Sequence, residues 1–204
     1  MKIAIIKYGM GNVASVKKII LKLGYECIIT NNYGEIKASD LIILPGVGSF
    51  EAGMMNLNKL GLVDVLTNEV IDNKKPFIGI CLGMQLTAKY GNEPYKVKGL
   101  GWIDGEVIRI TPKQNLRIPH LGWNNVLINN DNAFYKEFEN FDYYFIHSYH
   151  FKLSNTNHIV MTVNYDSELT AALQKDNIYA MQFHPEKSQE AGIKLLQKII
   201  DQYA

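Results

Sequence analysis

Short β-rich segments alternate with helical patterns through the first half of this 204-residue chain, and this alternation constrains its fold most. Parallel strands need helical crossovers, so the alternation predicts a parallel sheet covered by helices. In the first helix, Asn12 can cap the start and Gly24 suits a left-handed end. The predicted strands are 2–7, 26–30, 40–44 and 76–80, and the predicted helices are 12–23, 62–73 and 82–90.

From about residue 101 the pattern changes to successive strands, which favour antiparallel hairpins. A final amphipathic helix is predicted over 188–203, with Ile193, Leu196, Ile199 and Ile200 on one face. The sequence therefore predicts an α/β fold in one domain, 1–204: an open, mostly parallel sheet covered by helices, flavodoxin-like, with added antiparallel strands in the second half. These added strands are predicted over 106–110, 124–128, 143–147, 158–165, 169–174 and 178–183.

Composition excludes several classes of protein. Lys and Arg number 21 against 20 Asp and Glu, so there is no charge excess to attract nucleic acid or an anionic membrane. The apolar runs fall short of the roughly 20 residues of a membrane span, and the start lacks a signal-peptide pattern. We therefore expect a cytoplasmic protein. Two cysteines are too few for a disulfide framework, and we expect neither a metal nor a cofactor.

A cysteine bracketed by glycines is the sharpest local signal. An apolar strand runs into Gly79-Ile-Cys81-Leu-Gly83 and then into a helix. The glycines permit a tight turn that would expose Cys81 at the carboxyl edge of the sheet, and the helix N-terminus would favour a thiolate there. The alternative is a buried core cysteine, which is the commoner fate of a free thiol.

A thiolate nucleophile needs a proton-transfer partner, for which His184 is the best candidate. It ends an apolar strand, and Glu186 follows two residues later. In an extended backbone, side chains two residues apart point to the same side, so Glu186 can orient the imidazole. The alternative is a surface His-Pro-Glu turn.

A glycine-rich loop at Gly46, Val47 and Gly48 directly follows a predicted strand. Its N–H groups could bind an oxyanion, with the N–H of Leu82 as a second donor. A phosphate-binding loop is the competing interpretation, but the Gly-Lys-Ser/Thr that would follow it is absent.

Together these segments resemble class I (triad) glutamine amidotransferases, and in particular the glutaminase subunits of imidazole glycerol phosphate synthases. The resemblance spans nearly the whole chain. It implies that Cys81 attacks the side-chain amide of L-glutamine, that His184 acts as acid and base, and that Glu186 orients it. The segments that carry it are 45–50 (PGVGSF), 79–85 (GICLGMQ), 119–124 (PHLGWN), 147–149 (HSY) and 182–188 (QFHPEKS), with 8–12 (YGMGN).

The resemblance also implies roles for residues that spacing alone does not assign. The loop at 46–48 and Leu82 would form the oxyanion hole. Ammonia would pass through the protein to a barrel cyclase subunit, in a heterodimer that makes imidazole glycerol phosphate and aminoimidazole carboxamide ribotide in histidine biosynthesis. The implied glutamine-binding residues are Gln85, His147, Ser148 and Tyr149, and the implied partner contacts are Asn12, Trp123 and Lys187.

Several alternatives stay open. Trp123 could be a core residue, and Lys187 a solvated charge. Lys7 stands where relatives often carry an acidic residue, and residues 99–105 resemble paralogues that supply ammonia for amidation of a surface sugar. A non-catalytic regulatory binding module, or a redox or protease role for the Cys-His pair, is a further alternative.

Overall fold

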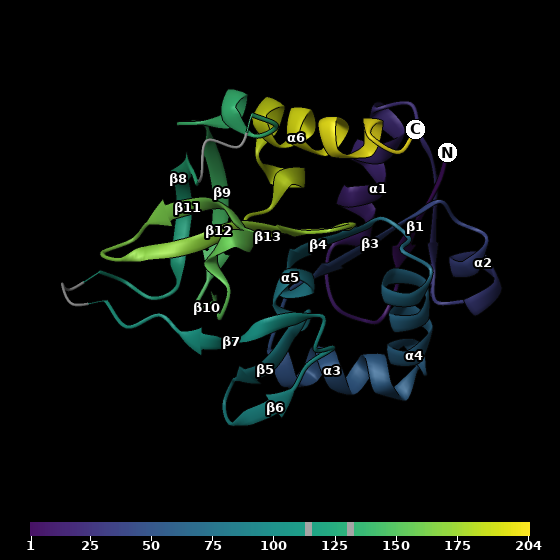
Figure 1. The fold of residues 1–204 in the computed structure, drawn as a ribbon, viewed down its shortest axis with the longest axis horizontal. Helices are drawn as coiled ribbons and strands as arrows, with labels where there is room; N and C mark the ends of the chain where they lie inside the picture. The colour runs from purple at the N-terminus through teal and green to yellow at the C-terminus, as the bar shows by residue number, and fades with distance from the viewer. Residues whose placement is uncertain (113–115, 130–132) are drawn as a thin grey trace.

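The central sheet has nine strands, with a parallel half and an antiparallel half (Figure 1). This computed structural model describes residues 1–112, 116–129 and 133–204. The first four pairings along the sheet are parallel and the next four antiparallel. In spatial order the strands are β2 (Glu26–Thr30), β1 (Lys2–Ile6), β3 (Leu41–Gly46), β4 (Phe77–Cys81), β13 (Ile178–Met181), β12 (Glu168–Lys175), β11 (Ile159–Asn164), β8 (His120–Ile128) and β9 (Asp142–His147).

Helices cover both faces of this sheet, as the alternation predicts. On one face, α1 (Val13–Lys22) and α6 (Gln189–Asp201) bury one hydrophobic cluster. A second cluster forms on the other face, under α2 (Tyr33–Lys37), α3 (Phe50–Lys59), α4 (Leu62–Thr67) and α5 (Leu82–Leu86). The π-helical turn η1 (Asn68–Asp72) continues α4, so the predicted helix over 62–73 is present as two pieces. No helix in the described part of the chain is long and apolar enough to cross a membrane.

The predicted ends of the first helix are confirmed. The Asn12 side chain accepts a hydrogen bond from the N–H of Ser15 at 3.2 Å, which caps α1, and Gly24 follows the helix with φ +87°. The last helix is also confirmed, but its buried face includes Leu195, whereas Ile193 is only partly buried.

A second, four-stranded sheet departs from the prediction. The helix predicted over 82–90 ends at Leu86, because the chain then pairs with β7 instead of continuing the helix. A side chain at Gly91 would collide with the ring of Phe50, so this strand lies tightly against α3. The strands, in order, are β10 (Tyr149–Leu153), β7 (Ile103–Arg109), β5 (Ala88–Asn92) and β6 (Lys96–Lys98).

The order of the parallel strands decides where chemistry can occur. Because β3, β4 and β13 are parallel neighbours, their carboxyl ends open at the same edge of the sheet. The loop after β3, the turn after β4 and the short 3₁₀ turn η4 (Pro185–Lys187), which follows β13, therefore meet there.

Candidate active site

Cys81 lies at the sharp turn between β4 and α5, as the glycine bracket predicts. Its backbone has φ +53° and ψ −109°. For a residue with a side chain, such a conformation costs about 1–3 kcal/mol and is typical of functional sites. Gly83 is needed because a Cβ there would collide with the carbonyl of Leu44, where α5 crosses β3. Cys81 is 6% exposed and opens into a pocket, so it is not a sealed core cysteine.

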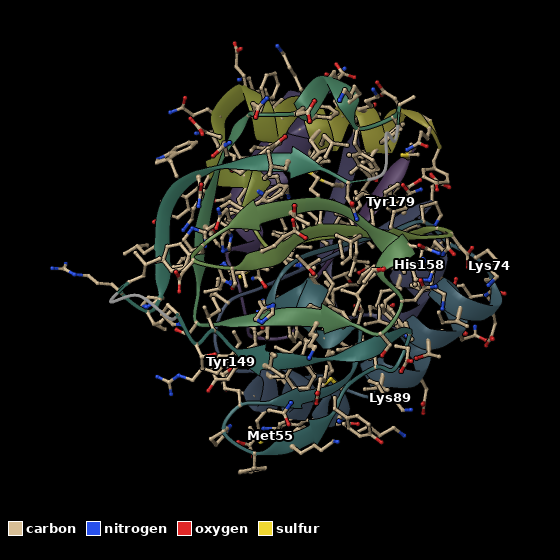
Figure 2. The ribbon with its side chains drawn as sticks, turned by 60° about the vertical axis from the view of Figure 1, so that its left-hand side comes forward. Met55, Lys74, Lys89, Tyr149, His158 and Tyr179 are labelled. Carbon is tan, nitrogen blue, oxygen red and sulfur yellow. The ribbon has the colours of Figure 1, made fainter. Side chains whose placement is uncertain are left out.

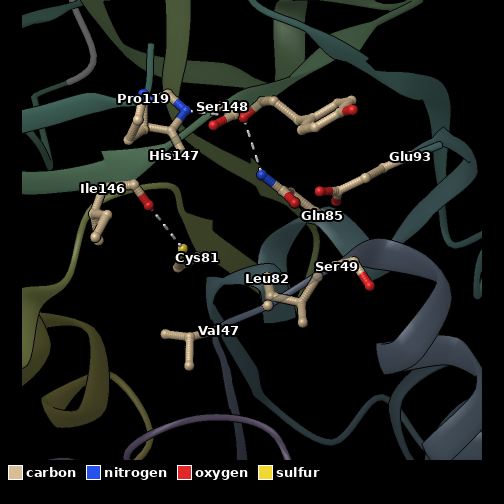
Figure 3. A pocket seen from close by; sticks show the side chains of 12 residues that line it. Val47, Ser49, Cys81, Leu82, Gln85, Glu93, Pro119, Ile146, His147 and Ser148 are labelled. Carbon is tan, nitrogen blue, oxygen red and sulfur yellow. Dashed lines mark hydrogen bonds between the residues drawn. The ribbon is translucent and has the colours of Figure 1, made fainter.

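The pocket of about 390 Å³ brings together residues predicted for three different roles (Figure 3). It joins the nucleophile candidate to the oxyanion loop and to the segment expected to hold glutamine. Its lining consists of Val47, Gly48, Ser49, Cys81, Leu82, Gln85, Glu93, Pro119, Ile146, His147, Ser148 and Tyr149.

His184 and Glu186 form a buried pair beside this pocket. The Nδ1 atom of His184 lies 2.7 Å from a carboxylate oxygen of Glu186, and the two side chains are 2% and 3% exposed. The burial excludes a surface turn. The predicted extended backbone is wrong, however, because Pro185 begins the 3₁₀ turn that brings the carboxylate back to the imidazole.

The electrostatics of His184 suit a thiolate partner. Burial alone would lower its pKa, but Cys81 and Glu186 outweigh the burial and raise the pKa to about 10. With Nδ1 held by Glu186, the buried Nε2 atom has no hydrogen-bond partner among the described residues. An imidazolium at neutral pH can stabilise a thiolate and can give a proton to a leaving group.

The glycine-rich loop lies next to Cys81, as expected of an oxyanion site. Gly46 pairs with Cys81 in the β3–β4 register, and a Cβ there would collide with the hydroxyl of Tyr8. Val47 is 43% exposed, and Gly48 has φ +114°. Both residues line the pocket into which Cys81 opens, so the N–H groups of this loop are candidates for an oxyanion site.

Gln85 forms one wall of the pocket. Its Nε2 atom donates to the carbonyl oxygen of Tyr149 at 3.1 Å (Figure 3). The same nitrogen donates to Oε1 of Gln182 at 2.9 Å. Gln182 in turn donates from Nε2 to the sulfur of Cys81 at 3.5 Å. The sequence placed Gln182 in a motif but gave it no role.

His147 supports the pocket wall with both ring nitrogens. Its Nδ1 atom lies 2.9 Å from the Tyr149 carbonyl oxygen, and its Nε2 atom lies 3.0 Å from Nδ1 of His120. Burial lowers the pKa of His147 to about 3 and that of His120 to about 4, so both rings are neutral at pH 7. The carbonyl oxygen of Ser148 also has a hydrogen-bond partner inside the protein, since it accepts a hydrogen bond from the N–H of Ile110.

Glu93 is a pocket residue that sequence reasoning missed. It follows β5, and its carboxylate accepts the N–H of Phe50 at 3.0 Å, at the start of α3. Only the packing of β5 and β6 against α3 brings Glu93 to the pocket, and no motif marks it. No cluster of three or more His, Cys, Asp or Glu in ranges 1–112, 116–129 and 133–204 could hold a metal ion.

Of the three residues expected to contact a partner, Trp123 on β8 and Lys187 in η4 lie outside the pocket, on either side of Tyr144 in the sequence, and both contact the ring of Tyr144 on β9. Trp123 is 48% exposed, which excludes core packing, and its ring lies edge-on to Tyr144 at 6.0 Å. The ammonium of Lys187 lies 5.4 Å from the centre of the same Tyr144 ring. Leu121 and Ile146 pair in the register and are also exposed. We call these five residues the β8–β9 face. Asn12 is exposed elsewhere, at its helix cap.

Comparisons with known proteins agree with this geometry. Residues 4–202 match the family described as glutamine amidotransferase class-I. The chain is 46% identical to imidazole glycerol phosphate synthase subunit HisH 2 of Methanococcus maripaludis, over 98% of this chain and 99% of that protein. It is 43% identical to subunit HisH 1 of Campylobacter jejuni, over 97% and 98% of the two chains.

A solved structure shows the same fold. A crystal structure described as a glutamine amidotransferase superposes with a TM-score of 0.75 at 17% identity, covering 95% of this chain and 96% of that chain. This confirms the predicted α/β fold, as a mixed sheet with a parallel core. From its sequence relatives and its fold, the chain belongs to the class-I glutamine amidotransferase family.

Proposed function

We propose that this chain is the glutaminase subunit of an imidazole glycerol phosphate synthase and hydrolyses L-glutamine to glutamate and ammonia. The observation that carries the proposal is Cys81, held in a strained turn at the pocket beside the buried His184–Glu186 pair. The relatives named as subunits of that synthase support the same assignment. The complete set of three residues argues against a non-catalytic binding module.

The geometry supports a two-step mechanism. The Cys81 thiolate attacks the side-chain carbonyl carbon of glutamine, and the N–H groups of Val47 and Leu82 stabilise the oxyanion. The C–N bond then breaks as His184 gives its proton to the departing nitrogen, which leaves ammonia and a glutamyl thioester. Neutral His184 next takes a proton from water, which attacks the thioester and releases glutamate and the Cys81 thiolate. Glu186 orients the ring in both steps.

Two acceptors in the pocket suit the α-ammonium group of glutamine. The Glu93 carboxylate supplies a negative charge, and the carbonyl oxygen of Gln85 faces the same pocket (Figure 3). The carbonyl oxygen of Tyr149 already accepts two hydrogen bonds, from Gln85 and His147. We therefore propose that it holds these pocket residues in place rather than binding the substrate itself.

A barrel cyclase subunit is the partner we propose, because free ammonia is mostly protonated at neutral pH and has to be delivered directly. The β8–β9 face supports this, because an exposed apolar surface marks an interaction site. Ile146 belongs both to this face and to the pocket. We propose a cytoplasmic location, which two free cysteines fit.

The decisive comparison is glutamine-dependent against ammonium-dependent synthesis by the reconstituted complex. Cys81→Ala should abolish synthesis from glutamine and leave synthesis from added ammonium salts intact. Loss of both activities would contradict the assignment, because the variant would then have disrupted the partner rather than the nucleophile.

A second candidate uses the same chemistry to supply ammonia for amidation of a surface sugar. The numerals in the names of the relatives favour keeping it, since they distinguish more than one such subunit in an organism. Residues 99–105 do not distinguish the two candidates, because Trp102 has a structural role: it packs in the core against Phe77, at 5.0 Å between ring centres. Rescue of a surface-glycan defect without rescue of a histidine auxotroph would select this candidate.

A further inference from the structure

An unbroken chain of hydrogen bonds connects strand β8 to the sulfur of Cys81. We call it the Asn124–Cys81 chain. Five of its six links have been described above, and two of them end on the carbonyl oxygen of Tyr149. In order, the distances are Asn124 Nδ2 to His120 Nε2 3.3 Å, His120 Nδ1 to His147 Nε2 3.0 Å, His147 Nδ1 to Tyr149 O 2.9 Å, Tyr149 O to Gln85 Nε2 3.1 Å, Gln85 Nε2 to Gln182 Oε1 2.9 Å and Gln182 Nε2 to Cys81 Sγ 3.5 Å.

The direction of every hydrogen bond on the glutamine side follows from one atom. A carbonyl oxygen can only accept, so the Gln85 atom that faces Tyr149 has to be nitrogen. The second N–H of that nitrogen then points at Gln182, which has to present its oxygen. The amide nitrogen of Gln182 is therefore left to face Cys81.

The histidine side has a fixed direction as well. Nδ1 of His147 donates to the Tyr149 carbonyl, so its Nε2 atom in the neutral ring accepts from Nδ1–H of His120. Nε2 of His120 then accepts from the amide nitrogen of Asn124. His120 is 3% exposed and stacks on Tyr165 and on Phe145, with ring centres 4.1 and 4.8 Å away.

These directions determine what the pocket offers to a substrate. Both N–H groups of Gln85 are used inside the protein, so its carbonyl oxygen is left for the pocket. An amide turned the other way would present N–H groups to an α-ammonium group and repel it. At the other end, an N–H donated to the Cys81 sulfur favours the thiolate over the thiol.

We propose that Gln182 and His120 are positioning residues for glutamine hydrolysis. Gln182 sets the direction of the Gln85 amide and donates to the nucleophile, and it is fully buried. His120 acts indirectly: it donates to His147, which in turn donates to the carbonyl oxygen of Tyr149. The inference rests on the proposed glutaminase activity and adds to it the residues that arrange the pocket.

Two substitutions of Gln182 separate its two contacts. Gln182→Glu keeps an acceptor toward Gln85 but loses the donor to Cys81, so KM should stay within about twofold while kcat falls about ten- to hundredfold. The pH profile of Cys81 alkylation by iodoacetamide should also shift to higher pH. This is measured in a Cys27→Ser background, which leaves Cys81 as the thiol that reacts. Gln182→Met removes both contacts, so KM should rise as well.

Substitutions of His120 test the other end. His120→Leu should raise KM about three- to tenfold without moving the pH profile of Cys81 alkylation, because its effect reaches only Gln85. His120→Asn should restore KM, since its amide nitrogen can replace Nδ1 as donor to His147. His158→Leu is the control. His158 lies beyond the far end of β10 from Tyr149, and Figure 2 shows the two residues well apart.

The outcomes distinguish this inference from the proposed function. If the wild-type complex does not hydrolyse glutamine, the proposed function fails. If it does, and Gln182→Glu leaves both kcat and the alkylation profile unchanged, the assignment of Gln182 is overturned. Equal losses in His120→Leu and His120→Asn would show only a packing role for that ring. Melting temperatures within a few degrees of wild type would exclude unfolding as the cause of any loss.

Discussion

At the scale of single residues, the backbone conformation of Cys81 matters for the site as much as its thiol does. The conformation at φ +53° and ψ −109° favours glycine, so the protein holds a non-glycine residue there against a local cost. Such a cost is tolerated where the side chain has to project from a turn into a pocket. The strain and the chemistry can be separated by substitution.

Replacing Cys81 with glycine should therefore give a more stable protein than replacing it with alanine. Both variants lose the thiol, but only glycine relieves the backbone, so the free energies of unfolding should differ by about 1–2 kcal/mol. Urea denaturation of the two variants measures this difference directly. Equal stabilities would mean that the turn is not strained.

Glu186 should matter for rate more than for fold. Glu186→Gln keeps a side chain of the same shape but removes the carboxylate that, after Cys81, raises the pKa of His184. By analogy with other oriented imidazoles, kcat should fall by about 10²- to 10⁴-fold. Glutamine turnover by the complex, with circular dichroism as the control for folding, checks this. A loss below twofold would contradict the assigned role.

At the scale of elements, strong periodicity predicted the helices α1 and α6 and the parallel strands, because their apolar faces are locally encoded. The helix predicted over 82–90 extends only to Leu86, and β5, β6 and β10 were missed, because tertiary pairing decides those short segments. The nucleophile turn could be predicted from its glycines. Glu93 and the role of Gln182 could not, since packing alone brings them to the pocket.

The crossing of α5 over β3 depends on a glycine. A Cβ at Gly83 would collide with backbone at Leu44, which cannot move aside as a side chain could. Gly83→Ala should therefore lower the free energy of unfolding by about 2–3 kcal/mol or more. Gly61→Ala is the control, because Gly61 has φ +64° but open space around it, and should cost only about 1 kcal/mol. Similar losses for both variants would contradict the close-packing argument.

The pairing of β8 with β9 should be sensitive to acid. His120 and His147 face each other in the register, and burial keeps the pKa of each below its usual value. In the unfolded chain these two imidazoles take up protons near pH 6.5, whereas in the folded protein they stay neutral. Their contribution to the free energy of unfolding is therefore fully present above about pH 6.5 and is lost as the pH falls toward 4. Free energies of unfolding at pH 7 and pH 5 should therefore fall less for His120→Asn than for wild type. An equal fall would contradict the prediction.

At the scale of the whole molecule, the exposed apolar surface and the pocket meet at Ile146. This placement suits a subunit that transfers ammonia to a partner.

Trp123→Ala should weaken binding of the barrel cyclase by about 30-fold or more, as loss of a central aromatic contact does, and should leave the melting temperature unchanged. Tyr95→Ala, which removes an exposed aromatic from the turn between β5 and β6 in the other sheet, should leave affinity unchanged. Calorimetric titration distinguishes the two, and equal affinities would contradict the interface.

The most direct test of the central claim is to identify the residue that a diazoketone analogue of glutamine modifies in the active complex. We predict one label per chain, on the peptide that carries Cys81, with loss of glutaminase activity in proportion to labelling and protection by glutamine. Full loss of activity with Cys81 unmodified, or a label on Cys27 instead, would contradict Cys81 as the nucleophile.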